Sequence, residues 1–214
     1  MVQALSVSKK LIIVTTSHRP TQRVRSFVKD LASVLPYAVK VNRGKASLLD
    51  LYYDAVAIGA KRVVIVGAKK GNPGIIRVYA PREPPDIGLD EIVVISLSGV
   101  KLRREHPEAQ KTFNTRSLGV DVRGVGDEIV KRVADTLVRA FLAKLVIFDE
   151  DVEKVDVLMK LRIEEKELVM TFVCSTTGRV CGPTLRVVAV RDNVAGYRVY
   201  IPGAREQEIG RSIG

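Results

Sequence analysis

The sequence predicts a mixed α/β fold of two closely packed halves with mixed sheets. Strand-like apolar stretches alternate with amphipathic helical stretches as far as about residue 107. Beyond that point, one long helical stretch is followed by a hairpin and further strands. The 214 residues are enough to bury a sizeable core. Because alternating strands and helices need crossover connections, we expect at least partly parallel pairing.

The first half begins with a strand and a helix. Residues 11–17, LIIVTTS, have the continuous apolar character of a strand that is buried on both faces. A helix is expected over 21–35, between Pro20 and Pro36, which suit its start and its end. Its apolar residues recur at helical spacing and form one face: Val24, Phe27, Val28, Leu31 and Leu35.

The rest of the first half contains a second helix and four strands. SLLDLYYDAVAIGA, residues 47–60, is an amphipathic helix that Gly59 can end. The turn KKGNPG (69–74) and the proline-rich loop PREPPD (81–86) connect the later strands. The expected strands are AVKVN (38–42), RVVIVGA (62–68), IIRVYA (75–80) and EIVVISLS (91–98).

The second half is organised differently. A long helix is expected over 125–148, with acidic residues in its first turn, where the helix dipole favours them. Residues 149–156, DEDVEKVD, form an acidic loop. Residues 156–174 alternate around a polar centre, which predicts a hairpin. TLRVVAV (184–190) and YRVYIP (197–202) are further strands.

The charge of the chain is concentrated in its first half. The net charge is +11, and the residues up to Pro107 hold 18 basic against 8 acidic side chains. This asymmetry favours a polyanionic partner, most often nucleic acid, over a surface charge that serves solubility alone. No apolar stretch approaches the ~20 residues needed to span a membrane. Since MVQALSVSKK at the N-terminus also lacks the order of a signal peptide, we expect a cytoplasmic protein without a membrane partner.

Cations and hydroxyls cluster in the loops after the first three strands. The carboxyl ends of adjacent parallel strands meet at one edge of a sheet, so these loops should be neighbours. Guanidinium groups, hydroxyls and backbone N–H groups at helix starts hold phosphates, and the 5% aromatic content favours recognition of backbone over bases. The predicted RNA-binding residues are Thr16, Ser17, Arg19, Arg23, Arg25, Lys29, Asn42, Arg43, Gly44, Lys45, Lys69 and Lys70. A solvated charged edge is the alternative.

Other kinds of site have less support. GAKKGNPG (67–74) is rich in glycine, but it lacks the P-loop pattern and a strand follows it, so no nucleotide cofactor is expected. Ser17 and His18 are sequence neighbours, which on a strand point to opposite faces, so they form a poor nucleophile–base pair. We expect no catalytic residues, no metal site and no cofactor. A phosphate-handling enzyme built on these two residues is the weaker alternative.

Two cysteines, Cys174 and Cys181, flank a turn-like TTG. They could face one another across a hairpin, and their spacing fits no four-ligand zinc pattern. Two free thiols are expected. A disulfide is the alternative if the source is a hyperthermophile, where intracellular disulfides occur.

Three motifs resemble those of the Brix domain family. LIIVTTSHRPTQRVRSFVKDL is similar to the TTSR-x-P-x-x-R-like signature of that family, an NRG triplet follows it, and GPTLRVVAV resembles the later glycine-proline motif. His18 stands where the signature has arginine, and Thr184 and Leu185 stand where a basic-aromatic pair is common. The matching residues are Thr15, Thr16, Ser17, Pro20, Arg23, Asn42, Arg43, Gly44, Gly182, Pro183 and Arg186.

The resemblance covers roughly residues 10–190 and is greatest to compact archaeal members, with the small-subunit processome member nearest among eukaryotic relatives. It implies that residues 1–214 form a single Brix domain, with halves at about 10–107 and 108–202. Each half would be similar to the anticodon-binding domain of class IIa aminoacyl-tRNA synthetases.

The function implied by the resemblance is non-enzymatic. The chain would be a ribosome biogenesis factor that binds a ribosomal RNA precursor and assists rRNA processing and subunit assembly. Arg186 would join the RNA-binding residues. Ribosome-assembly or ribosomal proteins are further candidate partners. The alternative is a protein-interaction scaffold that uses the second half and the acidic loop at 149–156, with RNA binding secondary.

Overall fold

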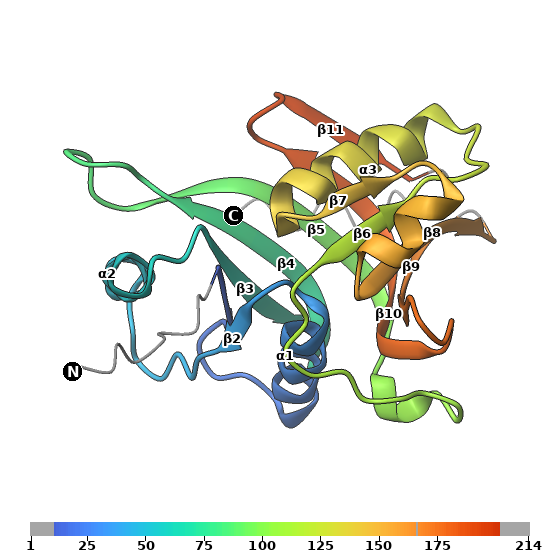
Figure 1. Ribbon diagram of the computed structural model, residues 1–214. Helices are drawn as coiled ribbons and strands as arrows, with labels where there is room; N and C mark the ends of the chain where they lie inside the picture. Colours follow the sequence, from blue (N-terminus) through green and yellow to red (C-terminus); the bar gives the residue numbers. More distant parts are fainter. Residues whose placement is uncertain (1–10, 166, 202–214) are drawn as a thin grey trace, which may run out of the picture.

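One continuous sheet runs through the computed structural model, which describes residues 11–165 and 167–201 (Figure 1). Its strands follow the order β2-β1-β3-β4-β5-β10-β9-β8-β6-β7, with β11 beside β10. The prediction of a mixed α/β fold is therefore confirmed. The comparison of residues 1–10 with a signal peptide, and Pro202 in the last expected strand, lie outside the described residues.

The first five strands form one end of the sheet. β1 lies between β2 and β3 and is parallel to both, and β4 and β5 continue the sheet in antiparallel pairing. The five strands are β1 (Ile12–Thr16), β2 (Ala38–Lys40), β3 (Arg62–Lys69), β4 (Asn72–Pro81) and β5 (Leu89–Lys101).

The same order of pairings recurs in the later strands. β6 is parallel to β7 and β8, after which β9 and β10 are antiparallel. Since β5 also pairs with β10, the two sets of strands share one sheet rather than forming separate sheets. The later strands are β6 (Leu118–Asp121), β7 (Lys144–Val146), β8 (Val157–Glu164), β9 (Glu167–Cys174), β10 (Val180–Asp192) and β11 (Tyr197–Tyr200).

The helices cover both faces of this sheet. The core of α1 (Gln22–Val34) is continuous with that of α3 (Glu128–Phe141), whereas α2 (Leu48–Ile58) packs on a separate core. Successive residues of a strand point to opposite faces, so Val14 of β1 joins the first core and Ile13 the second. Burial on both faces explains the continuous apolar character of β1.

Capping contacts mark the start of α1 and both ends of α2 close to the boundaries expected from the sequence. The hydroxyl of Thr21 accepts a hydrogen bond from the backbone N–H of Val24 at 3.3 Å. Ser47 and Asp50 cap α2 reciprocally, and Gly59 ends this helix with a left-handed φ of 70°. Both helices of the first half lie within two residues of their expected limits.

The expected helix over 125–148 is wrong in its last part. α3 ends at Phe141, Leu142 has a left-handed φ of 54°, and Lys144–Val146 forms β7, parallel to β6. A short, largely apolar run such as residues 144–146 is compatible with a helix or a strand, and its pairing with β6 makes it a strand here. The sequence reading also missed β6. Two short 3₁₀ helices are η1 (Arg103–Glu105) and η2 (Asp149–Lys154), the latter inside the expected acidic loop.

Cys174 and Cys181 are both free and buried, which agrees with the expectation of two thiols. Burial, together with the neighbouring Cys174, raises the pKa of the Cys181 thiol. Among the described helices, none has the length and apolar character to cross a membrane.

Candidate functional site

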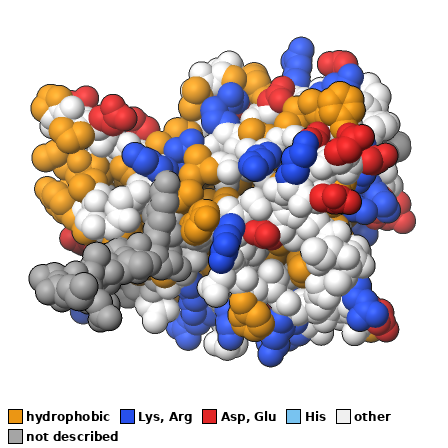
Figure 2. Space-filling model, in the orientation of Figure 1, with side chains coloured by type: hydrophobic (Ala, Val, Ile, Leu, Met, Phe, Trp, Pro, Cys, Tyr) orange, Lys and Arg blue, Asp and Glu red, His pale blue; other side chains and the backbone are white. Residues whose placement is uncertain are grey.

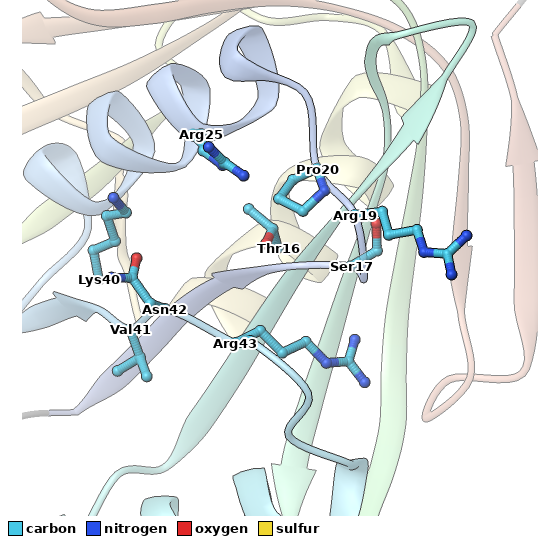
Figure 3. A pocket seen from close by; sticks show the side chains of 10 residues that line it. Thr16, Ser17, Arg19, Pro20, Arg25, Lys40, Val41, Asn42 and Arg43 are labelled. Carbon is cyan, nitrogen blue, oxygen red and sulfur yellow. The ribbon is translucent and has the colours of Figure 1, made fainter.

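A pocket of about 580 Å³ lies where β1 and β2 end and α1 begins (Figure 3). Both strands run parallel, so the loops that follow them leave the sheet at the same edge. The residues that line the pocket are Thr16, Ser17, Arg19, Pro20, Arg25, Lys40, Val41, Asn42, Arg43 and Gly44. The structure thus brings together the TSHRP and NRGK segments, which the sequence placed at one edge.

Hydrogen bonds between the strand ends hold this edge in place. The hydroxyl of Thr15 donates to the carbonyl oxygen of Val41 at 2.8 Å, and the N–H of Val41 donates to Val14 at 3.0 Å. The N–H of Ser17 donates to the carbonyl oxygen of Val66, at 2.8 Å, in β3. The strand ends that support the pocket are therefore tied to each other before any ligand arrives.

The two loops also meet through His18 and Gly44. Nδ1 of His18 lies 3.4 Å from the carbonyl oxygen of Gly44, whose φ of 55° favours glycine. Arg19 has a left-handed φ of 52°, a conformation that costs an ordinary residue about 1–3 kcal/mol. Figure 3 shows the side chains of Arg19 and Arg43 extending to the same side of the pocket. The backbone of this loop thus presents its cation outward.

Four cations line the pocket, and the described lining residues include no carboxylate. Within the described residues, Arg19, Arg25 and Lys40 have no ion pair or hydrogen bond from their side chains. Arg43 donates from Nε to the carbonyl oxygen of Ala46 at 3.0 Å. That bond orients the guanidinium and leaves its positive charge without a counter-charge. The pocket can therefore attract an anion and donate several hydrogen bonds to it.

Several predicted residues lie around the pocket instead of lining it. Lys29 is exposed on α1, one turn after Arg25, and Lys45 is exposed in the loop before α2. Lys69 and Lys70 are exposed at the β3–β4 turn. This turn touches the start of α1, because the hydroxyl of Thr21 donates to the carbonyl oxygen of Gly71 at 2.7 Å.

Arg23, one of the predicted phosphate contacts, is paired with an acidic side chain outside the pocket. Its guanidinium binds Glu105 through both terminal nitrogens, at 2.5 and 3.0 Å, and donates to the carbonyl oxygen of Val100 at 2.9 Å. The hydrogen bond from Arg23 holds the pKa of Glu105 below its ordinary value. Arg23 therefore fastens α1 to the end of β5 and to η1, and it does not line the pocket.

The third motif also has a structural position away from the pocket. Arg186 lies on β10 and donates to Glu167 at 2.8 Å. A Cβ atom on Gly182 would lie 2.7 Å from Val34 and 2.8 Å from Phe172. Glycine at this position therefore permits the close approach of α1 and β10, and Arg186 is not among the residues that line the pocket.

The sequence reading missed Lys40 and Val41, which line the pocket at the end of β2. Both belong to the expected strand AVKVN, which the sequence assigns to the sheet rather than to a ligand site. A signal was present: Lys40 is a charged residue at the carboxyl end of a strand, where ligands bind in open α/β sheets.

Comparison with proteins of known sequence identifies archaeal relatives. No family model matches the chain. A protein from Aeropyrum pernix, called "Probable Brix domain-containing ribosomal biogenesis protein", is 41% identical over 131 residues, 61% of this chain and 71% of the relative. A protein of the same name from Thermococcus kodakarensis is 40% identical over 95 residues, so the match covers only 44% of each chain.

Solved structures show the same fold. The "Crystal structure of probable ribosomal biogenesis protein from Aeropyrum pernix K1" is similar with a TM-score of 0.71 and 36% identity, over 83% of this chain and 95% of that one. An archaeal Imp4-like protein matches with a TM-score of 0.60 over 85% of this chain and 99% of its own. At 22% identity, the second likeness concerns the fold alone.

Proposed function

The chain belongs to the Brix domain family, and from this premise we propose that it acts in ribosome biogenesis by binding a ribosomal RNA precursor at the pocket. The role is non-enzymatic: the protein holds RNA during rRNA processing and subunit assembly. The proposed setting is the cytoplasm of an archaeal cell, because the relatives are archaeal.

The observation that carries this proposal is the convergence of four cations on one pocket. Arg19, Arg25, Lys40 and Arg43 come from four consecutive segments: the loop before α1, α1 itself, β2 and the loop after it. Single cations are common on protein surfaces. These four cations repel each other, because the described lining residues include no carboxylate to neutralise them. A polyanion removes this repulsion and releases its own counterions on binding.

The chemistry of the lining suits phosphate groups along a backbone. Arg19, Arg25 and Arg43 offer planar guanidinium forks, and Lys40 adds a point charge. The hydroxyl of Ser17 and the amide of Asn42 can add directional hydrogen bonds at the same edge. Lys29, Lys45 and the β3–β4 turn would extend the contact along the RNA. No aromatic side chain is among the described lining residues, which favours backbone recognition.

We also propose that residues 1–214 are a single Brix domain of two halves, at about 10–107 and 108–202, each like an anticodon-binding domain of a class IIa aminoacyl-tRNA synthetase. The recurring strand order supports this division: β2-β1-β3-β4-β5 has the same pairings as β7-β6-β8-β9-β10. Only the first of these sets carries the cationic pocket.

A salt series tests the proposed function. Binding of the whole protein to a structured ribosomal RNA precursor fragment would be measured by fluorescence anisotropy, with tRNA and duplex DNA as competitors. Each phosphate neutralised contributes about −0.7 to −0.9 to the slope of log K against log salt, so four pocket cations predict a slope of roughly −3. Preference for the precursor over both competitors is expected.

Matched variants locate the binding. Lys40→Glu with Arg43→Glu should reduce the affinity at least about a hundredfold and flatten the salt slope, because two attractions become repulsions. Lys61→Glu with Lys111→Glu makes the same change in net charge at exposed positions outside the pocket, and it should retain most of the affinity. Equal losses in both double variants, with both still folded, would remove the pocket from the proposal.

A further inference from the structure

Helix α2 exposes an apolar surface, which we call the α2 face. Five side chains of this short helix, Leu48, Leu49, Tyr53, Val56 and Ile58, are between 42% and 54% exposed. The loop between β4 and β5 adds Ile87, which is 56% exposed. The hydroxyl of Tyr52 donates to the carbonyl oxygen of Asp86 at 3.4 Å, which holds this loop beside α2. The α2 face consists of these six exposed side chains.

This exposure differs from that of the other helices. α2 buries Leu51, Tyr52 and Ala55 against the sheet, and a surface helix normally presents polar residues on its opposite side. On α1 the exposed positions are indeed polar, including Gln22 and Lys29. Single exposed apolar residues are ordinary, but a contiguous group marks an interaction surface. Figure 2 shows apolar side chains gathered on the side of the molecule where the β4–β5 hairpin projects.

The charges on α2 and in the β4–β5 loop beside it are mostly acidic, and the exposed Lys45 and Lys61 lie beyond the two ends of the helix. The helix carries Asp50 and Asp54 and no lysine or arginine, in a chain whose net charge is +11. The adjoining loop adds Glu83 and Asp86, both exposed, and its Arg82 is neutralised by Asp90 at 2.7 Å. Acidic side chains repel RNA and anionic lipid alike. An apolar surface with this rim suits a polypeptide that combines apolar residues with lysine or arginine.

We propose that the α2 face is a docking surface for a basic amphipathic segment of another protein. The apolar side of that segment covers Leu49, Tyr53 and Val56, and its cations meet Asp54 and the acidic loop. Because α2 starts directly after the loop that carries Arg43, a docked partner would lie next to the cationic pocket. The same domain can then hold RNA and a basic protein side by side.

The test uses a defined probe on the whole protein: an 18-residue helical peptide with leucine on one side and lysine on the other. Binding would be measured by anisotropy of a labelled peptide, against the same peptide with glutamate in place of lysine. We expect the leucine–lysine peptide to bind and the leucine–glutamate peptide to bind at least about tenfold more weakly.

Surface variants identify where the peptide binds. Leu49→Ser, Tyr53→Ser and Val56→Ser together should weaken the leucine–lysine peptide at least about tenfold, since these side chains supply the apolar contact. Asp54→Lys should weaken it by charge alone. The matched control is Phe113→Ser, which removes a side chain that is 76% exposed outside this face. RNA affinity should be the same in the triple variant and in Phe113→Ser, and it should rise by no more than about twofold in Asp54→Lys.

Three outcomes would overturn the proposal. One is unchanged peptide binding in the triple variant, and another is equal binding of the two peptides. The third is a concentration-dependent dimer in sedimentation velocity that the triple variant abolishes, without peptide binding, because a second copy of this chain would then occupy the face. The RNA measurement is independent of all three, so failure here leaves the pocket unaffected.

Discussion

The two sets of strands share one order of pairings but differ in charge at equivalent edges. In the first set, the loops after β1 and β2 carry Arg19 and Arg43, which have no carboxylate partner within the described residues. In the second set, the loop after β6 carries Arg123, which binds Asp121 at 2.8 Å and Asp149 at 2.5 Å. The first edge is therefore a cationic pocket, and the second is closed by its own ion pairs.

This difference shows that topology places loops together without deciding what they do. Both edges arise from parallel strands with a helix between them. At the second edge, Asp121 and Asp149 both pair with Arg123, so this cation links two loops. The absence of acidic partners among the described lining residues leaves the cations of the first edge for a ligand.

The helices are also anchored differently. α1 is fastened by Arg23 and Glu105, both of which remain about one-third exposed. α3 is fastened by Asp192, which is 1% exposed and accepts hydrogen bonds from Thr136, Arg139 and the backbone of the β10–β11 turn. A buried carboxylate depends on its partners more than a surface pair does. The anchor of the second half should therefore dominate stability.

The largest expected effect is on that buried anchor. Asp192→Asn should lower the free energy of unfolding by about 2–3 kcal/mol at pH 7, because the buried carboxylate charge that accepts the hydrogen bond from Arg139 is lost. Urea denaturation measures the change. Asp135→Asn, an exposed change on α3, should alter it by less than about 0.5 kcal/mol.

The same variant carries a pH signature. Burial alone would raise the pKa of Asp192, but the hydrogen bonds from Ala195, Thr136 and Arg139 outweigh it and hold this pKa below its ordinary value. A depressed carboxylate pKa contributes stability above the unfolded value near 3.8, and this stability is lost as the pH falls through the folded value. Because Asp192→Asn has no carboxylate at this position, its free energy of unfolding should fall less steeply with decreasing pH than that of the unchanged protein. If the free energy of unfolding fell equally with decreasing pH in both proteins, this role for Asp192 would be contradicted.

An intermediate effect separates the two edges directly. Lys40→Ala should weaken RNA binding roughly fivefold and leave the melting temperature unchanged, since Lys40 has no partner in the described part of the chain. Arg123→Ala should leave RNA binding unchanged and lower stability by about 1 kcal/mol through loss of its paired contacts. Anisotropy and thermal melting on both variants measure this. If Lys40→Ala and Arg123→Ala weakened RNA binding equally, RNA binding would not distinguish the first edge from the second.

The smallest effect is expected when the second half alone becomes more basic. Glu150→Gln with Glu153→Gln raises the net charge by two at exposed positions of η2. At 0.15 M salt the Debye length is about 8 Å, so charges outside the contact region are largely screened. RNA affinity should rise by less than about twofold in the same assay. A large gain would mean that net charge, rather than the pocket, determines binding.

The sequence alone predicted the elements that local patterns determine. The apolar face of α1, the glycine that ends α2 and the hairpin of β8 and β9 depend on spacing along the chain, and all are present. The expected helix over 125–148 failed because β7 is a strand only through its pairing with β6, which no local pattern encodes. The neighbouring positions of the first two loops followed from parallel pairing, a rule that holds without coordinates.

By itself, the sequence determined that this chain is a mixed α/β protein with its positive charge in the first half and cationic loops at the carboxyl ends of strands. Only the tertiary structure decided which cations remain available. Arg23 and Arg43 look equivalent in the sequence, yet Glu105, 82 residues away, neutralises the first, and no described carboxylate reaches the second. The physical reason is that an ion pair depends on distances of a few ångströms between residues far apart in the chain, and folding alone sets those distances.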